Sequence, residues 1–450
     1  MPSTDWLSRS TRAVWHPCTQ MQRHETFPLI PIARGEGVWL IDFDGKRYLD
    51  AVSSWWVNLF GHANPRINAA LIDQLGRLEH VMLAGFTHQP VVELSERLAA
   101  LSGLGHAFYG SDGASATEIA LKMSFQYWQQ SGAPQKSRFI HLEHSYHGET
   151  LGALAVTDVP LFRQTYAPLL NAALTAPSPD ARLAGPGETA ETVARRAAAG
   201  LEALLQQHAG EVAALIIEPL VQGAAGMAMH HPLYLAEARR LCNQYGAHLI
   251  ADEIAVGFGR TGTLFACEQA GVRPDFLCLS KGITGGYLPL SCVLTTDEVY
   301  AAFYHPDIRR GFLHSHSYTG NALACRAALA VLDIFAEDDV LAQNRAKAAA
   351  FAPLLAPLQA HPAVRHFRQQ GMIWAFDVTT TRSDFALAFF SAMLEQGCLL
   401  RPIGQTVYFM PPYVIEAEQM AQLVNATLRT LDALVGDGDG QAGEQEPAVP

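Results

Sequence analysis

The sequence predicts an α/β fold in which a mostly parallel sheet is covered by helices on both faces. Between residues 108 and 317, short apolar runs alternate with segments that have the period of an amphipathic helix. The runs lack polar alternation, which is typical of strands buried on both faces of a parallel sheet. Both ends of the chain instead mix helix and strand patterns, which indicates a smaller α+β domain built from the two ends together.

Five short apolar runs are candidate strands of the large sheet: 138–142, 213–217, 247–251, 276–279 and 291–294. Helix patterns at 117–129, 191–208 and 232–245 precede or separate these runs. We expect this alternation to place most of the strands parallel to one another.

The flanking segments predict the smaller domain. Residues 37–50 read as an antiparallel hairpin that turns at Asp44-Gly45. A long helical region begins at residue 322, and strands are expected near 373–378 and 406–410. We therefore divide the chain into four parts: the N-terminal part of the small domain (1–65), the large domain (66–325), the C-terminal part of the small domain (326–435) and a disordered tail (436–450).

Composition narrows the class of protein. The 450 residues are 49% hydrophobic and 16% charged, as expected for a globular protein with a large core. A net charge of −12 without a Lys/Arg-rich run argues against a nucleic-acid partner. We expect no membrane partner and a cytoplasmic location, because the sequence has no apolar stretch of membrane-span length and no signal-peptide core. The seven cysteines form no CxxC pair, which favours buried free thiols.

An acid and a lysine follow two of the predicted strands. Asp252 follows the run 247–251, and Lys281 follows the run 276–279. Parallel strands bring their carboxyl ends to one crevice, so the two side chains are expected to lie near each other. Such a pair could serve pyridoxal phosphate, since the amine forms a Schiff base with the aldehyde and the acid holds the pyridine nitrogen protonated. A structural ion pair is the alternative reading.

Small residues at 110–115 lead into a helix pattern that begins at Ala116. Backbone N–H groups at such a helix start can bind a phosphate. The same pattern also suits an ordinary helix cap with a glycine turn.

The segment 257–262 matches the G-x-G-x-x-G pattern of dinucleotide-binding proteins. Five residues separate it from the preceding strand, and no clear helix pattern follows it. This context argues against a dinucleotide site and a dehydrogenase.

Histidines cluster in two places without the spacing of a metal site, so no metal is expected; they are His141, His144, His147, His314 and His316. For His141 and His144 we favour hydrogen bonds to backbone. Tyr146 follows a predicted strand, where its ring could stack on a flat cofactor.

Two further features have open interpretations. Trp55 and Trp56 could pack in a core or interface, or they could line an apolar substrate channel. Arg401 follows an apolar run and could bind a substrate carboxylate, although a structural salt bridge is the commoner role.

Several segments dispersed over residues 14–415 resemble the class III aminotransferases, which are fold-type I enzymes dependent on pyridoxal 5'-phosphate (PLP). The shared segments of the whole family are 217–219, 251–254 with 257–262, and 280–282. Further segments resemble the branch of the family that acts in biotin biosynthesis: 15–17, 53–56, 87–88, 122–123 with 127–128, 146–148, 221–224, and 401–402 with 408–413.

The resemblance implies a role for each matching residue. Lys281 would bind the PLP aldehyde and move the substrate proton, and Asp252 would pair with the pyridine nitrogen. The remaining PLP contacts would come from Tyr146, Gly113 and Ala114, with His316 and Ser317 from the partner subunit of a homodimer. Substrate contacts would come from Trp55, Tyr146, Lys281, Ser315, Arg401 and Cys18.

The implied reaction moves an amine from S-adenosylmethionine to 8-amino-7-oxononanoate. The chain departs from the family pattern at Cys18, where tyrosine is frequent, at Ala114, where serine is frequent, and at Glu149, where aspartate is frequent. A cysteine lacks the reach and the phenolic hydrogen bond of tyrosine, so lysine as the donor stays open. The sequence is also compatible with a broader ω-aminotransferase or with a catalytically silent cofactor-binding protein.

Overall fold

The computed structural model describes residues 3–27 and 29–436. It divides into unit 1, with residues 1–65, 349–367 and 376–450, and unit 2, with residues 66–348 and 368–375. The predicted domain limits at residues 65 and 325 remain a prediction. Of the predicted tail, 437–450 lies outside the described residues, and Gly436 ends the last helix.

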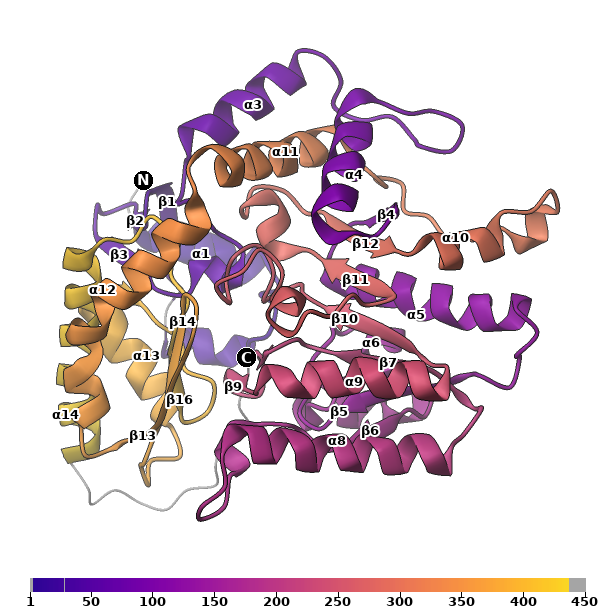
Figure 1. Ribbon diagram of the computed structural model, residues 1–450. Helices are drawn as coiled ribbons and strands as arrows, with labels where there is room; N and C mark the ends of the chain where they lie inside the picture. The colour runs from indigo at the N-terminus through magenta and orange to yellow at the C-terminus, as the bar shows by residue number, and fades with distance from the viewer. Residues whose placement is uncertain (1–2, 28, 437–450) are drawn as a thin grey trace. The chain divides into compact units, whose positions relative to one another are not determined.

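The apolar runs predicted as strands belong to a seven-stranded sheet in unit 2, in the order β4-β12-β11-β10-β7-β5-β6 (Figure 1). Its strands are β4 (His106–Gly110), β5 (Arg138–Leu142), β6 (Leu174–Ala176), β7 (Val212–Ile217), β10 (His248–Asp252), β11 (Phe276–Leu279) and β12 (Ser291–Thr295). Strand β12 pairs antiparallel with both β11 and β4, whereas the other pairs are parallel. The predicted mostly parallel α/β sheet is therefore confirmed.

Both faces of the sheet are buried, as the uninterrupted apolar runs predict. On one face, Ala214, Ile216, Ile250 and Phe276 pack in a single cluster with residues of α5 (Gly113–Gln130). The alternate residues of these strands point the other way and are equally buried. Two helices that pack on each other, α8 (Ala190–Gln207) and α9 (Pro232–Tyr245), contact β6 and β10 respectively (Figure 1).

The remaining elements of unit 2 are α3 (Pro65–Leu75, entered from unit 1), α4 (Gln89–Ser102), α6 (Leu151–Ala155), α7 (Pro160–Arg163), β8 (Val221–Gln222), β9 (Ala228–Met229), α10 (Asp297–Phe303) and α11 (Ala322–Glu337). Helix α12 (Val340–Ala360) runs from unit 2 into unit 1. No helix in the ranges 3–27 and 29–436 has the length and hydropathy that crossing a membrane requires.

Unit 1 contains two small sheets. The first has the order β1-β2-β3-β15, with β1 (Ile32–Glu36), β2 (Trp39–Asp42), β3 (Arg47–Asp50) and β15 (Cys398–Leu399). The second has the order β13-β14-β16, with β13 (Val364–Gln370), β14 (Ile373–Val378) and β16 (Thr406–Phe409); its hairpin end, 368–375, is counted in unit 2. The helices are α1 (Ser3–Ala13), α2 (Ser53–Trp56), α13 (Phe385–Glu395) and α14 (Ala417–Gly436). The hairpin predicted at Asp44-Gly45 is confirmed by antiparallel pairing of β2 with β3.

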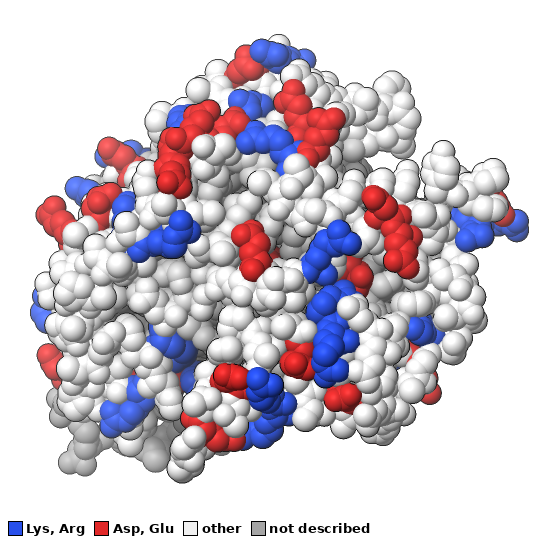
Figure 2. All heavy atoms as spheres, in the orientation of Figure 1, with Lys and Arg blue, Asp and Glu red and all other residues white. Residues whose placement is uncertain are grey.

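Charged side chains of both signs are interspersed on the face drawn in Figure 2. On helices α8 and α9 several of them form ion pairs within the helix. Arg195 pairs with Glu191 at 2.7 Å, and Arg240 pairs with Glu237 at 2.8 Å. Exposed pairs of this kind contribute little to stability, so we assign these charges to solvation of the surface.

Candidate active site

Two of the predicted site residues of unit 2, Asp252 and Lys281, lie at the carboxyl ends of neighbouring parallel strands. Asp252 ends β10 and pairs in register with Cys278 of β11, so Lys281 follows three residues beyond that partner. The turn that carries Lys281 is fixed by the Ser280 hydroxyl, which donates to the Leu290 carbonyl at 2.8 Å. The acid and the lysine are thus brought together at the carboxyl ends of neighbouring strands, as expected for a parallel α/β fold.

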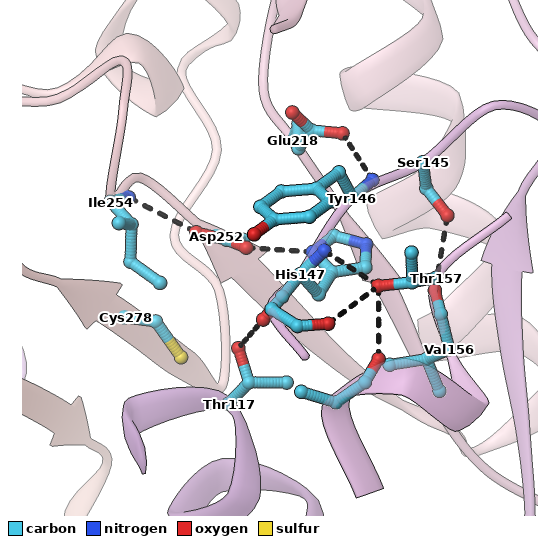
Figure 3. A network of polar contacts seen from close by, with 12 residues as sticks. Thr117, Ser145, Tyr146, His147, Val156, Thr157, Glu218, Asp252, Ile254 and Cys278 are labelled. Carbon is cyan, nitrogen blue, oxygen red and sulfur yellow. Dashed lines mark hydrogen bonds and ion pairs between the residues drawn. The ribbon is translucent and has the colours of Figure 1, made fainter. Parts of the chain in front are cut away.

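Asp252 is held by a histidine whose role the sequence did not indicate. The ring of His147 approaches Asp252 with 2.6 Å between Nδ1 and Oδ2, and the Ile254 amide donates to Oδ1 at 3.0 Å (Figure 3). A carboxylate only accepts, so Nδ1 of His147 carries the hydrogen. Both side chains are buried, and Nε2 of His147 has no hydrogen-bond partner in the described part of the chain. His147 therefore fixes the direction of the Asp252 carboxylate.

A second buried acid, Glu218, directly follows β7. Its carboxylate accepts from the Tyr146 amide at 3.1 Å (Figure 3). It also accepts from the Gly223 amide at 2.9 Å. Burial raises the pKa of Glu218 to about 7, with His147 opposing and Asp252 adding to the shift. Its place after a strand is the same signal that picked out Asp252, so the sequence held the information that could have found it.

Tyr146 is positioned from both ends. Its amide is held by Glu218, and its hydroxyl donates to the Glu149 carboxylate at 2.9 Å.

Lys281 lies in a constrained environment. Its φ of 45° is in the left-handed region that non-glycine residues seldom adopt. Burial lowers the pKa of Lys281 to about 8, while the negative charges of Asp252 and Glu218 act in the opposite direction. Desolvation disfavours the charged amine, so the neutral fraction of Lys281 at pH 7 is larger than that of an ordinary lysine.

The small residues at 110–115 connect β4 to α5, and the helix begins at Gly113 rather than at the predicted Ala116. Asp112 is the N-cap, and its carboxylate accepts from the Ser115 amide at 2.8 Å. This cap extends the helix by three residues toward the strand end. The amides of Gly113 and Ala114 fall in the first turn, where helix geometry provides no intrahelical partner.

The first turn of α5 is closely packed against its neighbours. A Cβ on Gly148 would lie 2.6 Å from the Cβ of Ala114, and the φ of Gly148 is 119°. A Cβ on Gly113 would lie 3.0 Å from a methyl group of Ile254. The loop that carries His147 is tied to the same helix, because the Thr117 hydroxyl donates to the His147 carbonyl at 2.8 Å.

The segment with Ser315, His316 and Ser317 lies in unit 2. His316 places Nδ1 3.2 Å from the Ser111 hydroxyl, two residues before Gly113. The Ser317 carbonyl lies 2.8 Å from Nε2 of His80, and the side chains of both serines are exposed. Within one chain, the structure brings His316 to the start of α5.

The other predicted substrate residues lie in unit 1. The guanidinium carbon of Arg401 is 5.5 Å from the ring centroid of Trp55, and Trp55 is 40% exposed. Cys18 is half-buried in a turn with a φ of 51°. Trp56 is buried, and its ring N–H donates to the Tyr408 hydroxyl at 3.1 Å. Trp56 therefore packs in the interior, whereas Trp55 is partly exposed.

The segments considered for other chemistries have structural explanations. In 257–262 the chain forms turns, and the next helix begins only at Ala266, so no helix start faces the glycines. Nδ1 of His141 lies 3.0 Å from the Leu142 carbonyl, which agrees with the predicted backbone contact. Within 3–27 and 29–436, no group of His, Cys, Asp and Glu has the arrangement of a metal site.

The residues present fit PLP. A lysine of lowered pKa and a fixed, buried carboxylate stand at the same sheet edge as the start of an 18-residue helix. The lysine supplies a reactive amine, and the carboxylate supplies a partner for a protonated ring nitrogen. The helix start supplies backbone N–H donors for a phosphate.

Comparison with known proteins identifies the family. The model of the aminotransferase class III family matches residues 20–431. The chain is 46% identical to the adenosylmethionine-8-amino-7-oxononanoate aminotransferase of Helicobacter pylori, over 94% of this chain and 96% of that protein. It is 40% identical to the protein of the same name from Geobacter sulfurreducens, over 96% and 98% of the two chains.

Solved structures of aminotransferases superpose closely on this chain. The adenosylmethionine-8-amino-7-oxononanoate aminotransferase of Methanocaldococcus jannaschii superposes with a TM-score of 0.89 at 33% identity, over 96% of this chain and 100% of that chain. An (S)-enantioselective ω-transaminase from Thermomicrobium roseum gives 0.91 at 29% identity, over 97% and 99%. The resemblance found in the sequence is confirmed: the chain belongs to the class III aminotransferase family.

Proposed function

We propose that this aminotransferase uses PLP to move an amine from S-adenosylmethionine to the ketone of 8-amino-7-oxononanoate, giving 7,8-diaminononanoate for biotin biosynthesis. The observation that carries the proposal is the set of Lys281, Asp252 and the start of α5 at one sheet edge. This set occurs in a chain 46% identical, over nearly its whole length, to a protein named for that reaction.

When bound, PLP supplies a ring that accepts the electron pair left as the substrate carbon loses its proton. Lys281 is assigned to hold the PLP aldehyde and, once released, would move that proton between the substrate carbon and the cofactor. Its lowered pKa suits this work, because the neutral amine is the form that accepts a proton. Asp252 is assigned to the pyridine nitrogen, with His147 fixing its direction.

The other PLP contacts follow from the first turn of α5. The amides of Gly113 and Ala114 are assigned to the phosphate, together with His316 and Ser317 contributed across the boundary of a homodimer. Tyr146 is assigned to stack on the ring, because its backbone and hydroxyl are both anchored. Ala114 lacks the hydroxyl group of the serine that is frequent at this position in the family, but its backbone N–H remains as a donor.

Substrate recognition is assigned to Trp55, Tyr146, Ser315 and Arg401, with Cys18 in place of the tyrosine that is frequent in the family. Arg401 can bind a carboxylate through two N–H groups, and Trp55 offers an apolar face beside it.

A homodimer is part of the proposal. The segment 304–318 exposes a run of large apolar side chains: Tyr304 (81%), Ile308 (72%), Leu313 (71%) and Tyr318 (65%). Grouped apolar exposure of this kind marks an interaction surface. Light scattering on the PLP-loaded protein is expected to give twice the chain mass. The cytoplasmic location stays a prediction from the sequence.

The deciding experiment follows the visible spectrum of the PLP-loaded protein during separate additions of S-adenosylmethionine and lysine. Loss of the bound-PLP band with S-adenosylmethionine alone is expected. Loss with lysine alone would keep the fold and the pathway but replace S-adenosylmethionine by lysine as the donor. The Lys281→Ala variant is the control, since it should show neither the bound-PLP band nor turnover.

A broader ω-aminotransferase is the second candidate, because the T. roseum ω-transaminase superposes with a TM-score of 0.91. Product analysis separates the two functions. Faster conversion of simple amines than of 8-amino-7-oxononanoate would favour the broader enzyme.

A further inference from the structure

The segment Ser53–Trp56 has an unusual backbone. Its four residues have φ values of 51°, 47°, 72° and 72°, all in the left-handed region, and none of them is glycine. In this region the Cβ of an L-residue crowds the following carbonyl oxygen, so such residues normally occur singly. Four in succession need support from their surroundings.

Asp50 supplies much of that support. Its side chain is fully buried at the end of β3, and both carboxylate oxygens are used. Oδ1 accepts from the amides of Val52 and Ser54 at 3.3 and 2.9 Å. Oδ2 accepts from the Ser54 hydroxyl at 2.7 Å and lies 3.0 Å from Nε2 of His62. The carboxylate therefore fixes the turn through its backbone and through a side chain.

The turn determines where Trp55 points. Ser53 and Trp56, the first and last residues of the turn, are buried. The Ser53 hydroxyl donates to the Met410 carbonyl at 2.7 Å. Trp55 is instead 40% exposed and meets the guanidinium of Arg401 at 5.5 Å. A cation over an aromatic face is attracted to it, so the two side chains fix each other's position.

Asp50 also pairs with the strand that precedes Arg401. Strand β15 runs parallel to β3 and pairs Leu399 with Asp50, so Arg401 follows two residues after that partner. Asp50 thus binds the turn that carries Trp55 and pairs with the strand that leads to Arg401.

We infer that Asp50 is a positioning residue, which holds Trp55 against Arg401 in the arrangement that receives the substrate carboxylate. This inference rests on the substrate contacts assigned under the proposed function.

The chain offers a matched control in Asp42, another buried aspartate that organises a turn of the same sheet. Its Oδ1 accepts from the amides of Asp44 and Lys46 at 3.0 and 2.8 Å, and its Oδ2 accepts from the Tyr48 hydroxyl at 3.0 Å. Asn in place of either aspartate keeps the acceptors for backbone amides and loses the second carboxylate oxygen.

The test compares Asp50→Asn with Asp42→Asn in the PLP-loaded enzyme. Asp50→Asn is expected to raise KM for 8-amino-7-oxononanoate about tenfold and to change kcat less than about threefold, because it removes binding contacts and leaves the reacting groups in place. The bound-PLP absorption should not change. Asp42→Asn should leave KM unchanged. An unchanged KM in Asp50→Asn, or an equal rise in both variants, would overturn the inference.

A second pair of variants covers the case in which Asp50→Asn does not fold. Ser54→Ala and Ser54→Gly both remove the hydroxyl, but only glycine adopts the left-handed turn without strain. Ser54→Ala should therefore raise KM more than Ser54→Gly. Equal, unchanged KM values in the two variants would contradict the role of the turn.

A spectroscopic readout separates failure of this inference from failure of the proposed function. The near-UV circular dichroism of Trp55 is obtained as the difference between each protein and its Trp55→Phe version. It should be lost in Asp50→Asn and retained in Asp42→Asn, whichever substrate the enzyme uses. Absence of turnover in the unmodified enzyme would reject the proposed function, whereas a retained Trp55 signal in Asp50→Asn would reject the positioning role.

Discussion

Lys281 should react with an aldehyde at a pH well below that of an ordinary lysine. Only the neutral amine is nucleophilic, and burial lowers the pKa of Lys281 to about 8. At pH 7 about one amine in ten is then neutral, against about one in 3,000 for an unperturbed lysine, so the reactive fraction is about 300-fold larger. The sign follows from desolvation, which disfavours the charged form.

The assay mixes PLP-free protein with PLP between pH 6 and 11, reduces samples with borohydride at timed intervals and measures modified Lys281 by peptide mass spectrometry. The rate should reach half its maximum near pH 8. Asp252→Asn should move this midpoint lower, because it removes a negative charge that favours the protonated amine. Lys281→Arg gives the background. A midpoint near 10.5 in the unmodified protein would refute the role assigned to desolvation.

Three further predictions concern the surroundings of the site. His147→Phe should weaken PLP binding at least about tenfold in a fluorescence titration, because Asp252 loses a charge-assisted hydrogen bond worth about 1.5–3 kcal/mol. Gly148→Ala should lower the free energy of unfolding by about 1–3 kcal/mol in urea, because its Cβ would overlap that of Ala114. Burial raises the pKa of Glu253 to about 7, so its native state retains the proton that the unfolded state releases near pH 4.5. The resulting loss of stability between pH 4.5 and 7, about 3 kcal/mol, should be absent from the pH profile of Glu253→Gln.

Each of these predictions has a contrary result. Unchanged PLP affinity in His147→Phe would mean that Asp252 does not depend on the histidine. Unfolding of Gly148→Ala at the same urea concentration as the unmodified protein would show that the loop yields to the extra methyl group. A parallel pH dependence of unfolding in Glu253→Gln and the unmodified protein would assign the effect to other groups.

The large sheet was predictable because burial on both faces leaves a simple signal. The run 276–279 contains only apolar residues and coincides with β11. Strand β4 gives no such signal, because it begins with a histidine and mixes aromatic and small residues. The antiparallel direction of β12 was not predictable either, since an apolar run carries no information on its direction.

The charged residues of the candidate site were predictable only where a strand end marked them. Asp252 and Lys281 follow apolar runs, and Glu218 does so as well. His147 lies in a loop, and its contact with Asp252 joins positions far apart in the chain. The left-handed turn at Trp55 had no sequence signal, because its residues have no preference for that conformation and its support comes from Asp50 and Met410.

The position of β12 has a consequence for the folding of the newly synthesised chain. Strand β4 lies at the edge of the sheet and pairs there with β12 alone. During synthesis, β4 and the start of α5 emerge early, but the strand that joins them to the sheet emerges after β11 and Lys281. Contacts between distant parts of a chain form slowly, so we expect the first turn of α5 to reach its final position late in folding. A chain released before Ser291 would contain both Lys281 and the start of α5 without the strand that aligns them.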